Sequence, residues 1–235
     1  MSNGQFSRSA MLYGADAQKK IESASVMICG VGAVGSFATE ALARIGVGKF
    51  ILVDCDSVAE SNINRQLCAL HSTIGKRKTD VMCDRILDIN PNAKVETFAE
   101  FIDASNVSRF VQMRPNVIVD AIDTISVKAD LACTALSEGV PIVSSMGAGR
   151  KTNPALVEVS QIFKTYNCPL ASRMRKELRL RGFKRADLKC VFSSELTTSE
   201  THITSENSEK IIGSTPMVTG VFGLMLANLA LEHIV

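Results

Sequence analysis

Apolar and polar positions alternate with two different periodicities along the chain. Short apolar runs of strand length, rich in β-branched residues, occupy residues 26–30, 49–54, 95–98, 116–121 and 141–145. Longer stretches with apolar side chains at helical spacing lie between them, at residues 34–45, 76–89 and 128–137. Strands that alternate with helices are typical of βαβ units, in which the strands are parallel and the crossovers right-handed. The pattern therefore predicts an α/β fold with a Rossmann-like, doubly wound, mainly parallel sheet.

The pattern of strand-like and helix-like segments changes after residue 150. Residues 156–162 alternate apolar and polar side chains, as in an antiparallel strand, and residues 188–194 form another apolar run. Between them, residues 169–185 carry a basic helix. Residues 197–208 are rich in Ser and Thr, and this composition predicts a mobile loop. We therefore expect an antiparallel part to be added to the sheet at its C-terminal end.

An apolar stretch at residues 217–231 comes near the end of the chain. A bilayer span takes about 20 residues, and this shorter stretch also contains Thr219 and Asn228. We expect a buried or dimer-forming terminal helix and no membrane contact. The whole pattern divides one domain into a core at residues 1–150 and a subregion at residues 151–235 for substrate selection and dimerisation.

Composition narrows the class of protein. The 235 residues are 46% hydrophobic and 21% charged, which fits one globular domain and excludes a wholly disordered chain. The net charge is only +2, so bulk charge does not drive binding to nucleic acid. Trp is absent and aromatic residues make up 5%, which disfavours a stacking platform for single strands.

The seven cysteines indicate a reducing compartment. No two of them are spaced as Cys-x-x-Cys, so the sequence suggests neither a disulfide framework nor a zinc site. The first residues show no basic start followed by an apolar stretch, so we expect no signal peptide and a cytoplasmic location.

A glycine motif follows the first predicted strand. Gly30, Gly32 and Gly35 form Gly-x-Gly-x-x-Gly between a strand and a helix. In this motif the first glycine permits the tight turn, the second lets a phosphate approach, and the third lets helix pack on sheet. Asp54 ends the second strand 19 residues after Gly35, where a carboxylate can bind a ribose. The spacing predicts a nucleotide site, and NAD, FAD and ATP all remain open.

The residues after Asp54 favour ATP over NAD. Asp56, Asn62, Arg65 and Gln66 follow the second strand, and Lys78 lies in a basic cluster further on. Arg binds phosphate oxygens in a bidentate way, which serves nucleotidyl transfer better than hydride transfer.

The fourth strand supplies two carboxylates. It ends at Asp120 and Asp123, and an acidic side chain beside phosphates suggests Mg²⁺. We therefore predict a site for ATP and Mg²⁺ with an aspartate beside the metal, although Asp123 on its own could also cap a helix.

Four stretches resemble the ThiF/MoeB/HesA adenylating enzymes, the superfamily of the ubiquitin-activating enzymes. They read FSRSAMLYG, VMICGVGAVGSFATEALARIGVGKFILVDCDSVAESNINRQ, GKRKTDVMCDRILDINP and VIVDAIDTISVK. The resemblance implies that a carboxylate attacks the α-phosphate of ATP to give an acyl adenylate and pyrophosphate. It also implies that Asp54 binds ribose, that Asn62, Arg65 and Lys78 handle phosphates, and that Asp123 holds Mg²⁺. The superfamily usually forms homodimers, and Arg8 matches an arginine that reaches the partner's ATP.

The second half of the chain is similar to one branch of that superfamily. The stretches CPLASRMRKELRLRG and KCVFSSE resemble enzymes that cyclise threonylcarbamoyladenosine in the anticodon loop of tRNA. The implied reaction adenylates the free carboxylate of the modified nucleoside and then closes a ring, with loss of water. A thioester is not required. We expect Cys168 and Cys190 to be buried or packed in the substrate channel, and a sulfur-relay or thioester role with a sulfur-transfer partner is the alternative.

A basic segment supports tRNA independently of the resemblance. Residues 164–189 carry nine basic and two acidic side chains in a chain of net charge +2. Such a local patch is typical of phosphate contact, whereas a solvated helix face or a dimer rim is the structural alternative. We expect sequence-independent contacts to the RNA backbone from Arg173, Arg175, Arg179, Arg181 and Lys184.

Three other functions remain to be tested. The first is an adenylyltransferase that activates the C-terminus of a ubiquitin-like sulfur-carrier protein. The second is an NAD-dependent oxidoreductase, which Arg65 and Asp123 disfavour. The third is a non-catalytic subunit, which is disfavoured because the matching phosphate-binding and metal-binding residues are all present.

Overall fold

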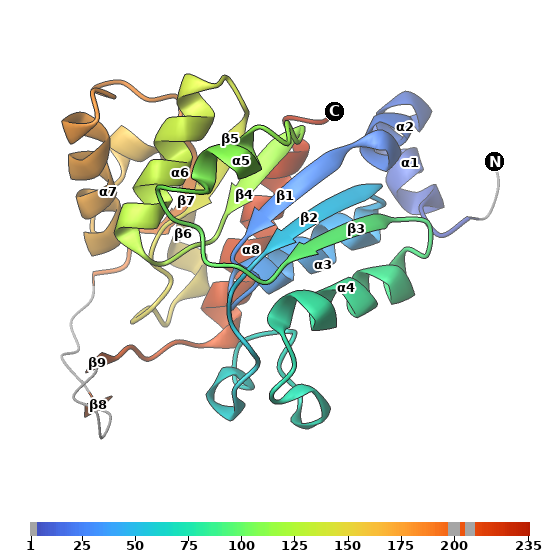
Figure 1. Ribbon diagram of the computed structural model, residues 1–235, viewed down its shortest axis with the longest axis horizontal. Helices are drawn as coiled ribbons and strands as arrows, with labels where there is room; N and C mark the ends of the chain where they lie inside the picture. Colours follow the sequence, from blue (N-terminus) through green and yellow to red (C-terminus); the bar gives the residue numbers. More distant parts are fainter. Residues whose placement is uncertain (1–3, 197–202, 205–209) are drawn as a thin grey trace.

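A seven-stranded sheet forms the centre of the computed structural model, which describes residues 4–196, 203–204 and 210–235 (Figure 1). The strand order is β3-β2-β1-β4-β5-β7-β6. Six strands are parallel, and β6 runs antiparallel to β7 at one edge. The strands are β1 Ser25–Cys29, β2 Lys49–Val53, β3 Lys94–Phe98, β4 Val117–Asp120, β5 Ile142–Ser145, β6 Val157–Gln161 and β7 Lys189–Ser193. A separate antiparallel pair joins β8 Ile203–Thr204 to β9 Lys210–Ile211.

Helices cover both faces of the sheet. One face carries α3 Gly35–Ile45, α4 Lys78–Ile89 and α8 Pro216–Leu231, and the other carries α5 Val107–Val111, α6 Ile125–Ser137 and α7 Pro169–Leu180 (Figure 1). The helices α1 Ser7–Tyr13 and α2 Ala15–Ser23 precede the first strand. Short 3₁₀ helices lie at Glu60–Asn62, His71–Thr73, Pro154–Leu156 and Ile162–Lys164. The predicted doubly wound α/β fold is confirmed.

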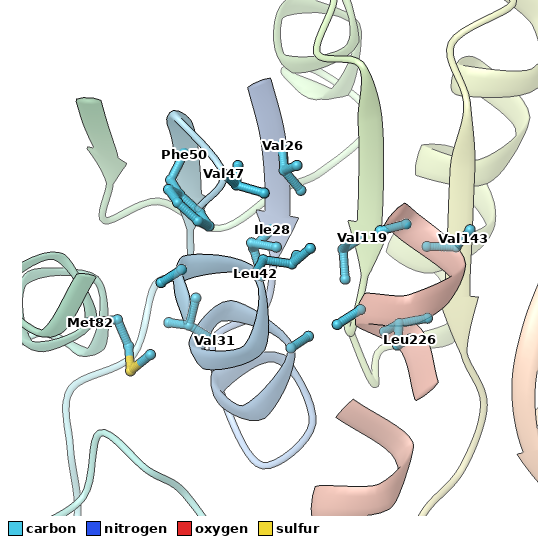
Figure 2. Packing of buried hydrophobic residues seen from close by; sticks show 14 of the residues in the cluster. Val26, Ile28, Val31, Leu42, Val47, Phe50, Met82, Val119, Val143 and Leu226 are labelled. Atoms are coloured by element: carbon cyan, nitrogen blue, oxygen red, sulfur yellow. The ribbon is translucent and has the colours of Figure 1, made fainter. Parts of the chain in front are cut away.

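Alternation along each strand divides the core into two layers. In β1, Val26 and Ile28 face one layer, while Met27 and Cys29 face the other. The first layer packs against α3, α4 and α8 and includes Leu42, Met82 and Leu226, as Figure 2 shows. The second layer packs against α5, α6 and α7. Burial on both faces explains why the strands read as continuous apolar runs and not as alternating ones.

The C-terminal part extends the same sheet. The strand β7 pairs in parallel with β5, and only β6 introduces the predicted antiparallel pairing. The apolar stretch near the end of the chain is α8, most of whose side chains are buried. Among the described residues, no helix is long and apolar enough to cross a membrane. The predicted mobile loop at residues 197–208 lies outside the described residues, apart from β8.

Candidate nucleotide-binding site

The carboxyl ends of the parallel strands open into a cavity of about 800 Å³. The loops after β1, β2, β4 and β5 all contribute to its lining. The chain runs from β1 to β2 on one side of the sheet centre, and β4 lies on the other. Ligands of doubly wound sheets bind at this kind of switch point, because the connecting loops separate there and leave a crevice.

The glycine turn between β1 and α3 is sterically enforced. Gly30 has a φ of +87°, and a Cβ atom there would lie 2.9 Å from the carbonyl oxygen of Ala121. A Cβ atom on Gly35 would lie 1.8 Å from the carbonyl oxygen of Gly30. At Gly32 the nearest atom would be 3.7 Å away, on the side chain of Gln66. Two of the three predicted glycines are therefore required by the fold itself, while Gly32 faces the cavity.

Asp54 connects the end of β2 to the glycine turn. Its Oδ2 accepts the N–H of Val31 at 2.8 Å, and its Oδ1 accepts the N–H of Asp56 at 2.8 Å. Burial raises the pKa of Asp54, although these two N–H donors oppose the shift. The carboxylate lines the cavity, where a ribose hydroxyl would find an acceptor already held in place.

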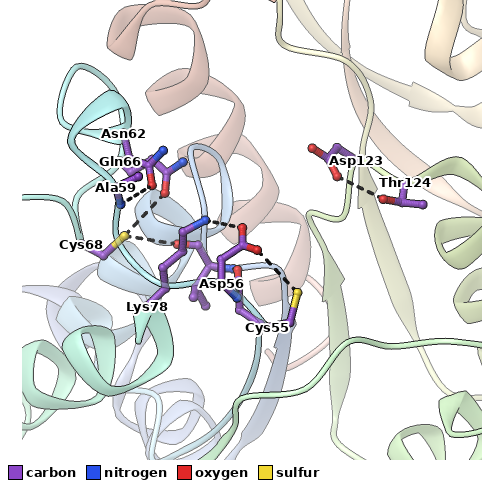
Figure 3. A network of polar contacts seen from close by, with 11 residues as sticks. Cys55, Asp56, Ala59, Asn62, Gln66, Cys68, Lys78, Asp123 and Thr124 are labelled. Carbon is purple, nitrogen blue, oxygen red and sulfur yellow. Dashed lines mark hydrogen bonds and ion pairs between the residues drawn. The ribbon is translucent and has the colours of Figure 1, made fainter. Parts of the chain in front are cut away.

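Lys78 and Asp56 form an ion pair inside the cavity (Figure 3). The Nζ atom of Lys78 lies 2.6 Å from Oδ2 of Asp56. Partial burial opposes ionisation of Asp56, but the hydrogen bond and the charge of Lys78, together with a hydrogen bond from Cys55, outweigh it and lower the pKa of the carboxyl group. An ammonium group has three N–H donors, so Lys78 can keep this partner and still contact a phosphate.

The 3₁₀ turn after β2 brings three more predicted residues to the cavity. The Oδ1 atom of Asn62 accepts the N–H of Ala59 at 3.1 Å. Gln66, four residues further on, is buried. Arg65 donates from Nη1 to the carbonyl oxygen of Ser61 and to Oδ1 of Asn64, both at 2.7 Å. All three predicted side chains line the cavity, so residues 62–66 form one of its walls.

Asp123 lies on the opposite side of the site in Figure 3. Its carboxylate is exposed, lines the cavity and contacts Oγ1 of Thr124 at 3.5 Å. It makes no ion pair with any residue that the structure describes. A carboxylate that lines the cavity and lacks a cationic partner offers oxygen ligands of the kind that Mg²⁺ prefers. The neighbouring Asp120 is instead fully buried and bound to Lys128, which the sequence did not reveal.

A second wall of the cavity was missed by sequence reasoning. It consists of Met146, Gly147, Ala148 and Gly149 after β5, together with the start of α7. Lys151, which is buried, donates from Nζ to the main-chain carbonyls of Asn167 and Glu195 and so holds this wall to the loop after β7. The glycines after β5 were the available signal, because Gly-rich turns at strand ends often mark a close approach to a ligand.

The five basic residues predicted to contact RNA divide into two groups. Arg173, Arg179 and Lys184 are exposed, and Arg173 lines the cavity. The guanidinium of Arg179 also stacks over the ring of Phe163, 5.1 Å from its centroid.

The other two are engaged within the chain. Arg175 donates to the carbonyl oxygen and hydroxyl of Thr165, and Arg181 bridges Asp130 and Glu177. The exposed group is thus the part of the predicted patch that is open to a ligand.

Arg8 stands apart from the other predicted site residues. It is exposed on α1 and is not among the residues that line the cavity. The same helix exposes Met11 and Leu12, at 66% and 77%.

Cys168 and Cys190 are poor candidates for nucleophiles. All seven lie within the described residues without a disulfide. Burial raises the pKa of Cys190 to about 12, which suppresses the thiolate needed for covalent chemistry. Cys168 lines the cavity but is buried, and its Sγ atom accepts the N–H of Ala171 at the start of α7. Among the described residues, one group of possible metal ligands gathers at Asp54, Cys55 and Asp56.

The sheet order and the cavity at its switch point define a Rossmann-like nucleotide-binding protein with cationic side chains in the nucleotide site. The model of the ThiF family matches residues 6–235. The chain belongs to the ThiF family.

Three comparisons extend this result. The tRNA threonylcarbamoyladenosine dehydratase of Bacillus subtilis is 41% identical over 191 residues, which cover 81% of this chain and 75% of that protein. The protein of the same name from Escherichia coli is 33% identical and covers 97% of this chain and 92% of its own. The crystal structure of the Escherichia coli enzyme with ATP superposes with a TM-score of 0.91, at 33% identity, over 98% of this chain and 93% of that one.

Proposed function

We propose that this protein is a tRNA threonylcarbamoyladenosine dehydratase, an ATP-dependent adenylating enzyme that closes a ring on the modified adenosine. One observation carries the proposal. The glycine turn, Asp54 and Arg173 of the basic helix α7 line one and the same cavity. A nucleotide and a tRNA-borne carboxylate can therefore meet in one site. Relatives with this name match nearly the whole chain, and one of them has been solved with ATP.

The reaction takes place in two steps. A carboxylate oxygen of threonylcarbamoyladenosine attacks the α-phosphorus of ATP, and the bond from that phosphorus to the bridging oxygen breaks. Pyrophosphate leaves with the electron pair, and an acyl adenylate remains. The N6 nitrogen of the adenine, which carries the carbamoyl group, then attacks the acyl carbon and loses its proton, so that a five-membered ring closes and AMP departs. The tRNA has lost one molecule of water.

The chain supplies charge and position for these steps. The glycine turn receives phosphates against the N-terminus of α3, and Asp54 accepts from the ribose. Lys78 and Arg65 stabilise the negative charge that grows on the α-phosphate and on pyrophosphate. Asn62 and Gln66 orient the phosphates, and Asp56 holds the ammonium of Lys78 in the cavity.

We further propose that Asp123 holds Mg²⁺ with ATP. A bound magnesium ion neutralises phosphate oxygens and so lowers the barrier to attack. The exposed carboxylate of Asp123, on the cavity wall opposite Lys78, supports this assignment.

A homodimer would complete the site. We propose that α1 packs on the partner subunit, so that Arg8 reaches the partner's phosphates. The support is physical: α1 exposes the neighbouring apolar side chains of Met11 and Leu12 one turn after Arg8, and adjoining exposed apolar side chains can form a contact surface. In this arrangement residues 1–150 bind ATP, and residues 151–235 select the substrate. Seven cysteines without a disulfide fit a cytoplasmic location.

The test uses purified protein, ATP and tRNA that carries threonylcarbamoyladenosine. We expect AMP and pyrophosphate to form in equal amounts and the modified nucleoside to lose the mass of one water. The same tRNA without the modification is the control and should yield no AMP. Turnover triggered by a ubiquitin-like protein, with no change in the mass of the tRNA, would instead support the sulfur-carrier adenylyltransferase.

A further inference from the structure

A buried ion pair lies directly beneath the nucleotide site. The Nζ atom of Lys128 on α6 lies 2.8 Å from Oδ2 of Asp120 at the end of β4, and both side chains are 0% exposed. Ser144 on β5 donates its hydroxyl to the same Oδ2 atom at 2.6 Å. Neither Asp120 nor Lys128 lines the cavity, so the pair cannot touch a nucleotide. Because desolvating two charges costs about as much as their attraction returns, stability alone is a weak reason for such a pair.

Both members of the pair hold the backbone of one residue, Ile122. Asp120 accepts the N–H of Ile122 through Oδ1 at 3.1 Å, and Lys128 donates from Nζ to the carbonyl oxygen of Ile122 at 2.9 Å. Charged partners therefore fix one polar group in each of the two peptide units that flank the Cα atom of Ile122. Charge-assisted hydrogen bonds are about twice as strong as neutral ones, so these two peptide units have little freedom to rotate.

The clamped residue immediately precedes Asp123. The carboxylate of Asp123 has one side-chain contact among the described residues, the 3.5 Å contact with Thr124. On the other side, the N–H of Lys128 bonds to the carbonyl oxygen of Thr124 at 3.0 Å, as α6 begins. The backbone is thus fixed before and after Asp123, while its side chain is left free to face the cavity. The position of this carboxylate is set by the backbone and not by side-chain partners.

The same strand end also supports the glycine turn. The N–H of Ala121 bonds to the carbonyl oxygen of Cys29 at 2.9 Å. The carbonyl oxygen of Ala121 lies so near Gly30 that a Cβ atom there would be only 2.9 Å away. Residues 120–124 are therefore tied to β1 at one end and to α6 at the other.

We infer that Asp120 and Lys128 are positioning residues, which hold Asp123 where it can bind the magnesium ion of the ATP complex. This inference rests on the proposed function, because it assumes that Asp123 binds that ion. It assigns a role to two charges that never meet the substrate. Outer-shell partners that orient a ligand typically change metal affinity about 10–100-fold when they are removed.

The test compares ATP affinity with and without magnesium. Calorimetric titration with ATP in Mg²⁺ and then in EDTA gives a ratio for each protein, which we call the magnesium gain. The main variant carries Asp120→Asn with Lys128→Met, so that no unpaired charge is buried. Asn still accepts the N–H of Ile122, but Met cannot hold its carbonyl. We expect the magnesium gain to fall about tenfold or more, with little change of affinity in EDTA.

Two further variants separate positioning from general damage. Lys128→Arg keeps a cationic donor and should therefore retain part of the magnesium gain that the double variant loses. A purely structural role predicts no such difference between the two proteins. Asp123→Ala should abolish the gain, and adding Lys128→Met to it should then change nothing more, because both substitutions act through one carboxylate.

Ser144→Ala serves as the packing control. It removes a contact of Asp120 but none of Ile122, so the gain should stay near the wild-type value.

The possible outcomes are distinct. An unchanged gain in a folded double variant overturns the inference. A wild-type protein without any magnesium gain overturns the proposed role of Asp123 and, with it, the metal part of the proposed function. If the double variant does not fold, amide exchange of the wild-type protein decides: the amide of Ile122 should be protected, and exchange at the rate of an unstructured peptide overturns the clamp.

Discussion

Lys78 and Asp56 meet across 2.6 Å, yet their exposures differ tenfold, with 6% of the lysine side chain and 60% of the aspartate side chain open to solvent. The pair connects the start of α4 to the segment after β2, and both residues line the nucleotide cavity. The lysine therefore depends on this one carboxylate, whereas the carboxylate is also hydrated. Loss of Asp56 would leave a buried ammonium group without its ion-pair partner.

This asymmetry gives a pH dependence with a defined sign. The pKa of Asp56 in the folded protein is lowered from 3.8, although partial burial opposes the shift. A carboxyl group with a lowered folded pKa stabilises the fold above its unfolded pKa, and that contribution is lost as the pH falls through the folded pKa. We predict that Asp56→Asn is less stable than the wild type at neutral pH and that the difference shrinks in acid.

Urea unfolding at a series of pH values measures this difference. Glu60→Gln is a matched control, because Glu60 is exposed and makes no ion pair among the described residues. A difference between Asp56→Asn and the wild type that stays constant from neutral to acid pH would contradict the prediction.

Arg65 should matter for turnover more than for ATP affinity. Its guanidinium group hydrogen-bonds to its own loop through Nη1 and lies in the cavity wall. If it stabilises charge that develops on the phosphates, Arg65→Ala should slow turnover about a hundredfold or more, with a modest loss of ATP affinity. Arg65→Lys should not restore the rate, because the planar fork is lost.

The matched control for Arg65 is Arg44→Ala. Arg44 also forms an exposed contact, with Glu40 on α3, but it does not line the cavity. Steady-state AMP formation and ATP titration measure the two effects separately. Full activity of Arg65→Ala would remove Arg65 from the proposed site.

Two glycines of the same motif should respond to alanine in different ways. In Gly35→Ala the new Cβ atom would lie 1.8 Å from the carbonyl oxygen of Gly30, so backbone must move. We expect a loss of at least about 3 kcal/mol in the free energy of unfolding. In Gly32→Ala the nearest atom lies at 3.7 Å, and we expect a folded protein that binds ATP poorly.

Thermal unfolding and ATP titration distinguish these two cases. If the Gly32→Ala protein binds ATP with normal affinity, the phosphates do not approach this position. A stable Gly35→Ala protein would show that the turn can rearrange.

The exposed basic residues of α7 and the loop after it should contribute most of the salt dependence of tRNA binding. Replacing Arg173, Arg179 and Lys184 together by Ala removes three cations that are open to solvent. Because each phosphate contact contributes about one to the slope of log affinity against log salt, we expect that slope to fall by about three. Filter binding at several salt concentrations measures the slope.

Three exposed lysines elsewhere provide the matched control. Lys19, Lys20 and Lys94 lie on α2 and β3, and their replacement by Ala removes the same charge. An equal loss of slope in both triple variants would mean that tRNA senses the net charge and not the patch. The affinity for ATP should differ little between the control and the wild type.

The sequence predicted several of the residues that line the cavity near the glycine turn, because this part of the lining is encoded locally. The turn from Gly30 to Gly35 and the end of β2 at Asp54 each lie within one βα unit, where spacing alone predicts the geometry. The cavity includes Asn62, Gln66 and Lys78 for the same reason.

The parts that the sequence did not reveal depend on distant contacts. Lys128 is an exception, because it lies in the same βα unit as Asp120, but its spacing does not show that α6 turns its ammonium group back onto the end of β4. Lys151 finds its acceptors at Asn167 and Glu195, far along the chain. The engagement of Arg175 and Arg181 within the chain was also hidden, because charge patterning does not say which cations already have partners.

The position of β7 in the sheet determines when each half of the cavity can be completed. The chain makes β6 first, then α7, and only then β7, which inserts between β5 and β6. Among the described strands, β6 pairs with β7 alone, so it has no sheet partner while residues 189–193 are still unsynthesised. Glu195, whose carboxylate accepts the N–H groups of Thr152 and Asn153, then holds the second wall in place. In a growing polypeptide, the strands on either side of the glycine turn are therefore synthesised well before the residues that hold the second wall.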